Sequence, residues 1–98
     1  MSRPVALGPS TLVRQARAIP FTPVGDDHLA IDAESGSCWA LDRVGARVWA
    51  LLDPPVTLSE LCSRLREEFE VDEETCRRDV TQLLERLLEE GLVLATDG

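Results

Sequence analysis

The chain has 98 residues and a formal net charge of −8, and all ten of its basic residues are arginine. This length allows one domain with a single modest core. Residues 1–17 hold Arg3, Arg14 and Arg17 and no acid, a net charge of +3, whereas residues 18–98 hold seven arginines and eighteen acids, a net charge of −11. The strongly acidic segment 18–98 repels duplex DNA, so no nucleic-acid partner is expected.

The cysteines and the hydropathy pattern indicate a cytoplasmic protein. The chain has three cysteines, Cys38, Cys62 and Cys76, and none of them belongs to a CxxC motif. We therefore expect them to be small buried thiols in a reducing compartment. Only His28 is available as a further zinc ligand, and the spacing does not match a zinc site, so no metal and no cofactor are expected. No apolar run approaches the roughly 18 residues of a membrane span, and no signal-peptide core is present.

The first part of the chain predicts a short antiparallel sheet of about three strands. Residues 1–17 have only a weak apolar pattern and predict a flexible N-terminal arm or an irregular first strand, with the folded domain over residues 18–98. Residues 19–24 contain two prolines, which lack an amide donor, so this segment can only be an edge or irregular strand. Residues 28–33 and 37–41 alternate in the way of strands, and turn sequences separate them.

Three capped helices and a closing strand follow. Asp42 can cap the first helix, Thr57 the second as part of a capping box, and Asp72 the third. Apolar residues recur at helical spacing in each segment. On the third helix these residues are Cys76, Val80, Leu83, Leu84, Leu87 and Leu88. Gly91 fits the helix end, and residues 92–95 fit a short strand. The predicted fold is α+β, a small sheet followed by a three-helix winged helix-turn-helix core.

A set of motifs in fixed order carries a family resemblance. The motifs are Trp39, Leu41-Asp42, Gly45, Trp49 to Leu52, Phe69, Val71-Asp72, Asp79-Val80, Leu83-Leu84 and Gly91-Leu92. Over residues 19–95 this set resembles the PqqD-like family, also called RiPP recognition elements, where RiPP denotes a ribosomally synthesised and post-translationally modified peptide. The chain departs from the family at Asp42, where Asn is common, and at Cys38 beside the aromatic residue.

The resemblance implies a peptide chaperone. Such proteins bind the leader segment of a precursor peptide and hand it to modifying enzymes. The leader adds as an antiparallel strand to the third strand of the sheet, and its side chains fill a groove between that strand and the third helix. The chain looks most like the stand-alone elements of lasso-peptide systems, whose partners are a leader protease and a macrolactam cyclase. Radical-enzyme pathways use the same module.

Carried onto this chain, the resemblance implies a peptide-binding edge at residues 37–42 and a groove wall on residues 73–90. The candidate peptide-binding residues are Ser37, Cys38, Trp39, Ala40, Leu41, Asp79, Val80, Leu83, Leu84 and Leu87. For each leucine and for Trp39 the competing interpretation is a place in the core. For Asp79 it is a solvated carboxylate on a polar helix face.

Other functions have less support. No catalytic motif is present, and His28, expected on an exposed strand face, has no visible partner, so we expect a non-enzyme. The alternative is a winged-helix transcription factor, or a modulator of one, with the third helix in the major groove. Residues 72–90 carry seven acids against three arginines, and this charge disfavours that alternative. A purely structural interaction module is a third hypothesis. An unpaired strand edge allows either a monomer or a weak dimer.

Overall fold

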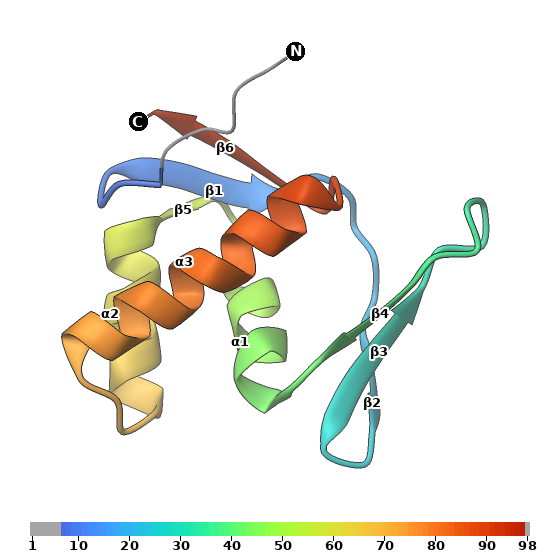
Figure 1. Ribbon diagram of the computed structural model, residues 1–98, viewed down its shortest axis with the longest axis horizontal. Helices are drawn as coiled ribbons and strands as arrows, with labels where there is room; N and C mark the ends of the chain where they lie inside the picture. Colours follow the sequence, from blue (N-terminus) through green and yellow to red (C-terminus); the bar gives the residue numbers. More distant parts are fainter. Residues whose placement is uncertain (1–6, 98) are drawn as a thin grey trace.

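Two three-stranded antiparallel sheets and three helices make up residues 7–97, the part of the chain that the computed structural model describes (Figure 1). The helices are α1 (Arg43–Leu51), α2 (Leu58–Glu68) and α3 (Glu73–Glu89). The strands of the first sheet are β5 (Val56–Thr57), β1 (Thr11–Gln15) and β6 (Val93–Asp97), and those of the second are β2 (Thr22–Val24), β3 (Asp27–Ile31) and β4 (Cys38–Leu41). The predicted α+β class is confirmed.

The first sheet was not expected from the sequence. Its central strand is β1, which pairs with β5 on one side and β6 on the other. Of the two alternatives for residues 1–17, a flexible arm or an irregular first strand, Thr11–Gln15 takes the strand, and Val13 is fully buried there. Residues 1–6 of the expected arm lie outside the described residues. The closing strand expected at residues 92–95 forms as β6, and its partner is this N-terminal strand.

The second sheet is the expected meander, in the order β2-β3-β4. Its inward face carries Ala30, Leu41 and His28, and its outward face carries Ile31, which is 70% exposed. His28 was expected on an exposed face, but the register pairs it with the buried Leu41 and places it on the inward face. Its Nδ1 is buried and has no hydrogen-bond partner within residues 7–97.

The helices begin and end where local chemistry predicts. Asp42, Thr57 and Asp72 each accept a hydrogen bond from the amide three residues later, at 2.7, 3.2 and 3.1 Å. These bonds satisfy amides that the first helical turn leaves without partners. After α3, Gly91 adopts a positive φ of 74°, and the Leu92 amide donates back to the Leu87 carbonyl. The three predicted caps and the predicted helix stop are thus confirmed.

The core lies between the first sheet and the helices (Figure 1). Its largest fully buried side chains are Leu52, Leu58, Leu61, Leu65, Leu84, Leu92, Val13, Val48 and Val93. Val13 of β1 and Val93 of β6 therefore cover the apolar stripes of the helices, and the first sheet closes the domain. None of the helices in the described part of the chain is long and apolar enough to cross a membrane.

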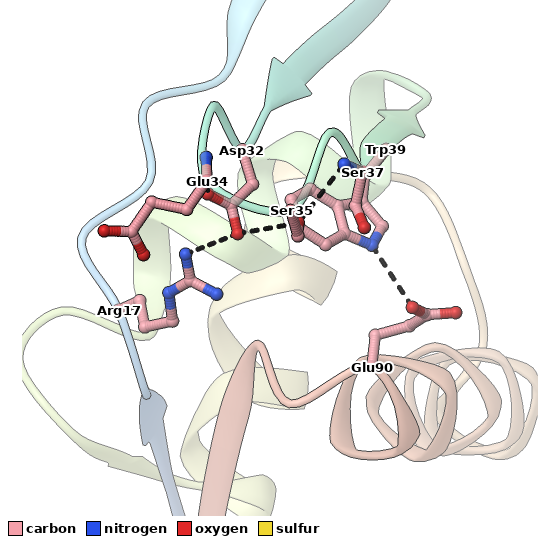
Figure 2. Close-up of polar contacts among 7 residues, drawn as sticks. All are labelled: Arg17, Asp32, Glu34, Ser35, Ser37, Trp39 and Glu90. Carbon is pink, nitrogen blue, oxygen red and sulfur yellow. Dashed lines mark hydrogen bonds and ion pairs between the residues drawn. The ribbon is translucent and has the colours of Figure 1, made fainter.

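The meander extends from the helical body and is attached by a small set of contacts (Figure 1). The Phe21 and Trp49 rings meet edge to face with centroids 5.3 Å apart, and the Trp49 indole N–H donates to the Ile19 carbonyl at 3.2 Å. The Arg17 guanidinium donates to Asp32 Oδ2 at 2.7 Å (Figure 2). The first contact fixes the start of the meander on α1, and the second fixes the β3–β4 turn to the segment that follows β1.

We expect Trp49→Ala to lower the free energy of unfolding by about 3–5 kcal/mol, because it empties a large aromatic site and leaves the Ile19 carbonyl without its donor. Trp49 is only 6% exposed. Urea denaturation followed by circular dichroism measures the change. Leu94→Ala serves as control, since Leu94 is 42% exposed and its loss should cost less than about 1 kcal/mol. Equal effects in the two variants would contradict this account of the core.

The Arg17–Asp32 pair predicts a stability change in acid. The hydrogen bond from Arg17, and then that from Ser35, hold the pKa of Asp32 below its ordinary value. A carboxyl whose folded pKa is depressed stabilises the fold above its unfolded pKa, about 3.9, and this contribution is lost as the pH falls through the folded pKa. We expect Asp32→Asn to melt below the wild type at pH 7 and the gap between them to close on acidification. A gap in melting temperature that is constant from pH 7 to about pH 2 would contradict this.

Candidate functional site

The edge strand β4 has an open side. It pairs with β3 alone in the described chain, so its other side presents main-chain donors and acceptors without strand partners. The Asp32 amide donates to the Ser37 carbonyl at 2.8 Å, while the Ser37 amide donates to Ser35 Oγ at 3.2 Å. The first bond sets the phase of the ladder between β3 and β4, in which hydrogen-bonded and non-hydrogen-bonded pairs alternate. Cys38 and Ala40 therefore direct their N–H and C=O groups away from β3, toward the open side.

A groove of about 350 Å³ lies beside this edge, between β4, the start of α1 and α3. The residues that line it are Ala40, Leu41, Asp42, Val44, Gly45, Val48, Asp79, Val80, Leu83 and Arg86. Leu41, Val48 and Val80 are buried and form an apolar floor, while Leu83 is half-buried. Charged side chains stand at the rim. The groove can thus hold an apolar side chain and offers charges of both signs around it.

The junction between β4 and α1 is tightly packed at Gly45. A Cβ on Gly45 would lie 3.2 Å from Asp42 Oδ1 and 3.3 Å from side-chain atoms of Leu41. Both distances are tighter than ordinary van der Waals contact, so a larger residue requires these side chains to shift by a few tenths of an ångström. The absent side chain of Gly45 thus lets the first turn of α1 lie close to β4 at one wall of the groove.

The structure brings together half of the predicted site residues. Ala40 and Leu41 from β4 meet Asp79, Val80 and Leu83 from α3 along the groove. The strand and the helix are far apart in sequence, so the prediction that they form one site depended on the family resemblance. In the structure these five residues line one groove.

The other half of the predicted residues does not line the groove, although Cys38 belongs to the open edge of β4. Ser37 and Cys38 are exposed at the start of β4, beyond the groove. Trp39 is half-buried, and its indole N–H donates to Glu90 Oε2 at 3.4 Å, which places it against the end of α3 (Figure 2). Leu84 and Leu87 are 0% and 3% exposed and belong to the core instead of the groove. The prediction that these two leucines line the groove is therefore wrong. They lie on the side of α3 that packs against the core.

Sequence reasoning missed several groove residues. These are Val44, Gly45, Val48 and Arg86, whereas Asp42 lay within the predicted edge at residues 37–42. A signal for Arg86 was present, because it follows Leu83 by three positions and Asp79 by seven and so shares their helix face. Val44, Gly45 and Val48 come from α1. Their place in the groove follows from the tight junction between β4 and α1.

A second hollow of about 330 Å³ continues past the groove between α1, α2 and α3. It shares Val44, Asp79 and Val80 with the groove and is otherwise mostly apolar, with Phe69 and Val71 in its lining. The apolar surface is therefore continuous from β4 to the N-terminal end of α3.

The buried thiols do not supply a nucleophile. Burial raises the pKa of the Cys62 thiol to about 11, and burial also raises the pKa of Cys76. A thiol with a pKa of about 11 stays protonated at neutral pH and reacts slowly. Among residues 7–97, no group of three or more His, Cys, Asp or Glu side chains is arranged to hold a metal ion.

Three solved structures are similar to this chain. TbiB1 in complex with the TbiA(beta) leader peptide has 26% identity and a TM-score of 0.68, covering 82% of this chain and 93% of that chain. Lasso peptide synthetase B1 complexed with the leader peptide has 26% identity and a TM-score of 0.67, covering 84% and 96%. The PqqD truncation of Methylobacterium extorquens PqqCD, a functional and stand-alone RiPP recognition element, has 20% identity and a TM-score of 0.74, covering 91% and 95%. At that identity the third likeness shows the fold alone.

Comparison with curated proteins gives no match. The family profile described as coenzyme PQQ synthesis protein D (PqqD) matches residues 27–93, a span that runs from β3 to the start of β6 and so includes both walls of the groove. The chain belongs to the PqqD family.

Proposed function

We propose that this protein binds the leader segment of a ribosomally synthesised precursor peptide along β4 and delivers it to modifying enzymes. The observation that carries the proposal is the open side of β4 next to an apolar groove. Two similar structures, each at 26% identity, are complexes with leader peptides and support it.

Strand addition explains how the site would work. The outward N–H and C=O groups of Cys38 and Ala40 would pair with the main chain of the leader, and each such bond contributes about 0.5–1.5 kcal/mol net. Side chains alternate along a strand, so every second leader side chain would point into the groove. An apolar one on the Leu41, Val80 and Leu83 surface would add about 1.5–3 kcal/mol if fully buried. The main chain thus fixes the register and the groove supplies selectivity.

The orientation of the leader follows from the orientation of α3. Glu90, at the C-terminal end of α3, contacts Trp39 near the start of β4, whereas Asp79 lies with Asp42 at the end of β4. The helix and the strand are therefore antiparallel, and a leader antiparallel to β4 runs in the same direction as α3. Its N-terminal part would lie near Asp79, and its C-terminal part would leave past Trp39 toward the enzyme.

The protein would act as a recognition element instead of a catalyst. The buried Cys62 and Cys76 thiols, whose pKa values burial raises, are consistent with this. We propose that α1 to α3 with β6 form a winged helix-turn-helix, used here to hold a peptide. A leader protease and a macrolactam cyclase are the proposed enzyme partners, with a radical enzyme as the other possibility. The proposed compartment is the cytoplasm, where ribosomes make the precursor.

The leader encoded beside this gene should perturb the amide resonances of residues 38–41 and 79–86 in a titration.

Ala40→Pro should weaken binding about tenfold, because it removes an outward donor and bends the edge while the β3–β4 ladder keeps its bonds. Ala40→Val keeps the donor and is the control. Leu83→Asp should weaken binding by at least about tenfold, since it leaves an unpaired charge against the apolar leader residue. Ile31→Asp on the outward face is its control.

Each variant is first checked for a wild-type circular dichroism spectrum and melting curve. Perturbations confined to the α1–α2 connection, with residues 38–41 and 79–86 unmoved, would show that the leader binds elsewhere. If Leu83→Asp and Ile31→Asp lose the same amount of leader affinity, the groove does not contribute to leader binding.

Duplex DNA should show no specific binding at about 0.15 M salt. The third helix, which would enter the major groove in the alternative function, lies in a body of net charge −11, and phosphate contacts depend on cations that release counterions. A mobility-shift assay with a pool of random duplexes measures this. A tight complex that persists when the salt is doubled would contradict peptide binding as the main function.

A further inference from the structure

Arg86 is a cation at the rim of the groove, and it has no ion-pair partner within residues 7–97. Ion pairs of 2.7 to 3.8 Å hold five other arginines: Arg17, Arg47, Arg64, Arg66 and Arg78. Arg43 lies over the Phe69 ring. Within residues 7–97, no carboxylate is within ion-pair distance of Arg86, although it lines the groove. Its five N–H donors are therefore available to a ligand.

Two acidic residues lie close to Arg86 in the sequence, yet neither forms an ion pair with it within residues 7–97. Glu89 and Glu90 follow Arg86 by three and four positions, a spacing at which helical side chains commonly pair. Glu90 instead accepts from the Trp39 indole, toward the start of β4 (Figure 2). Arg86 lies with Ala40 and Leu83 at the groove. A peptide on the open side of β4 would therefore pass the guanidinium.

The position of the matching peptide residue can be estimated. Leu83 and Arg86 are about 4.5 Å apart along the helix axis. Groove-facing side chains on an extended leader recur about every 6.8 Å, and the long arginine side chain spans the difference. Because the leader runs in the same direction as α3, the residue facing Arg86 lies two positions C-terminal to the residue held by Leu83.

The other end of the groove has the opposite charge. Asp79 lies about 10.5 Å from Arg86 along the helix axis, and Asp42 also lines the groove, so an acidic leader residue near these carboxylates is repelled. The long-range field of a chain with net charge −8 also favours basic peptides. A preference for an acid at one position thus has to come from a local contact.

We propose that Arg86 selects leaders in which a large apolar residue is followed, two positions later, by an aspartate or glutamate. This inference rests on the proposed leader binding and specifies the substrate class of the same site. The competing role for Arg86 is to cover the apolar floor with its aliphatic stem. That role requires no charge on the side chain and no acid on the peptide.

A phage-displayed library of random 16-residue peptides, selected on the full chain, tests the proposal. Wild-type protein should enrich an acid two positions after a large apolar residue. In a synthetic peptide of this class, acid→Lys should weaken binding to the wild type by about fivefold or more. Arg86→Glu should reverse the preference, and Arg86→Met, which keeps the stem, should abolish it. Arg77→Glu makes the same charge change away from the groove on the same helix and should leave the preference intact.

The outcomes separate this inference from the function that it rests on. Peptides that shift residues 38–41 but show no acid preference, or keep that preference with Arg86→Glu, overturn the role of Arg86 and leave strand addition standing. A reversal that Arg77→Glu reproduces also overturns it, since the cause would then be net charge. Selected peptides that leave residues 38–41 unmoved, or a library without binders, overturn both.

Discussion

The junction of β4 with α1 is the constraint on which the rest of the site depends. Asp42 ends the strand and caps the helix in one step, with its Oδ1 2.7 Å from the Gly45 amide. The missing side chain of Gly45 lets the first helical turn lie against Leu41. Because Leu41 is buried there, the strand is held at one end by the helix and on one side by β3. Its remaining side is left open next to α3.

The domain separates the surfaces that stabilise it from the surface that it offers to a ligand. On α3, Leu84 is fully buried in the core, while the adjacent Leu83 is half-buried in the groove. A helix turns by about 100° per residue, so two adjacent leucines point in different directions and can have different roles. The meander depends on other contacts, among them the Arg17–Asp32 pair, for its position.

Local chemistry made some features predictable and left others open. The caps at Asp42, Thr57 and Asp72 involve residues three positions apart, so the sequence alone predicts them. The first sheet pairs residues 11–15 with 56–57 and 93–97, and no short pattern encodes partners at such separations. The assignment of Leu83 to the groove and Leu84 to the core is also non-local, because the apolar stripe of α3 includes both and only packing decides between them.

Strand addition has a consequence for selectivity. Main-chain bonds to Cys38 and Ala40 would form with any extended peptide, so they distinguish poorly between sequences. Discrimination has to come from the few side chains that line the groove, and those present an apolar floor between unlike charges. One apolar contact is worth only about 1–3 kcal/mol of discrimination between similar side chains. A charge order along the peptide adds a repulsive element against wrong partners, which apolar contacts alone cannot provide. A short groove with an arginine at one end and two aspartates at the other can therefore choose among peptides that all fit the same strand.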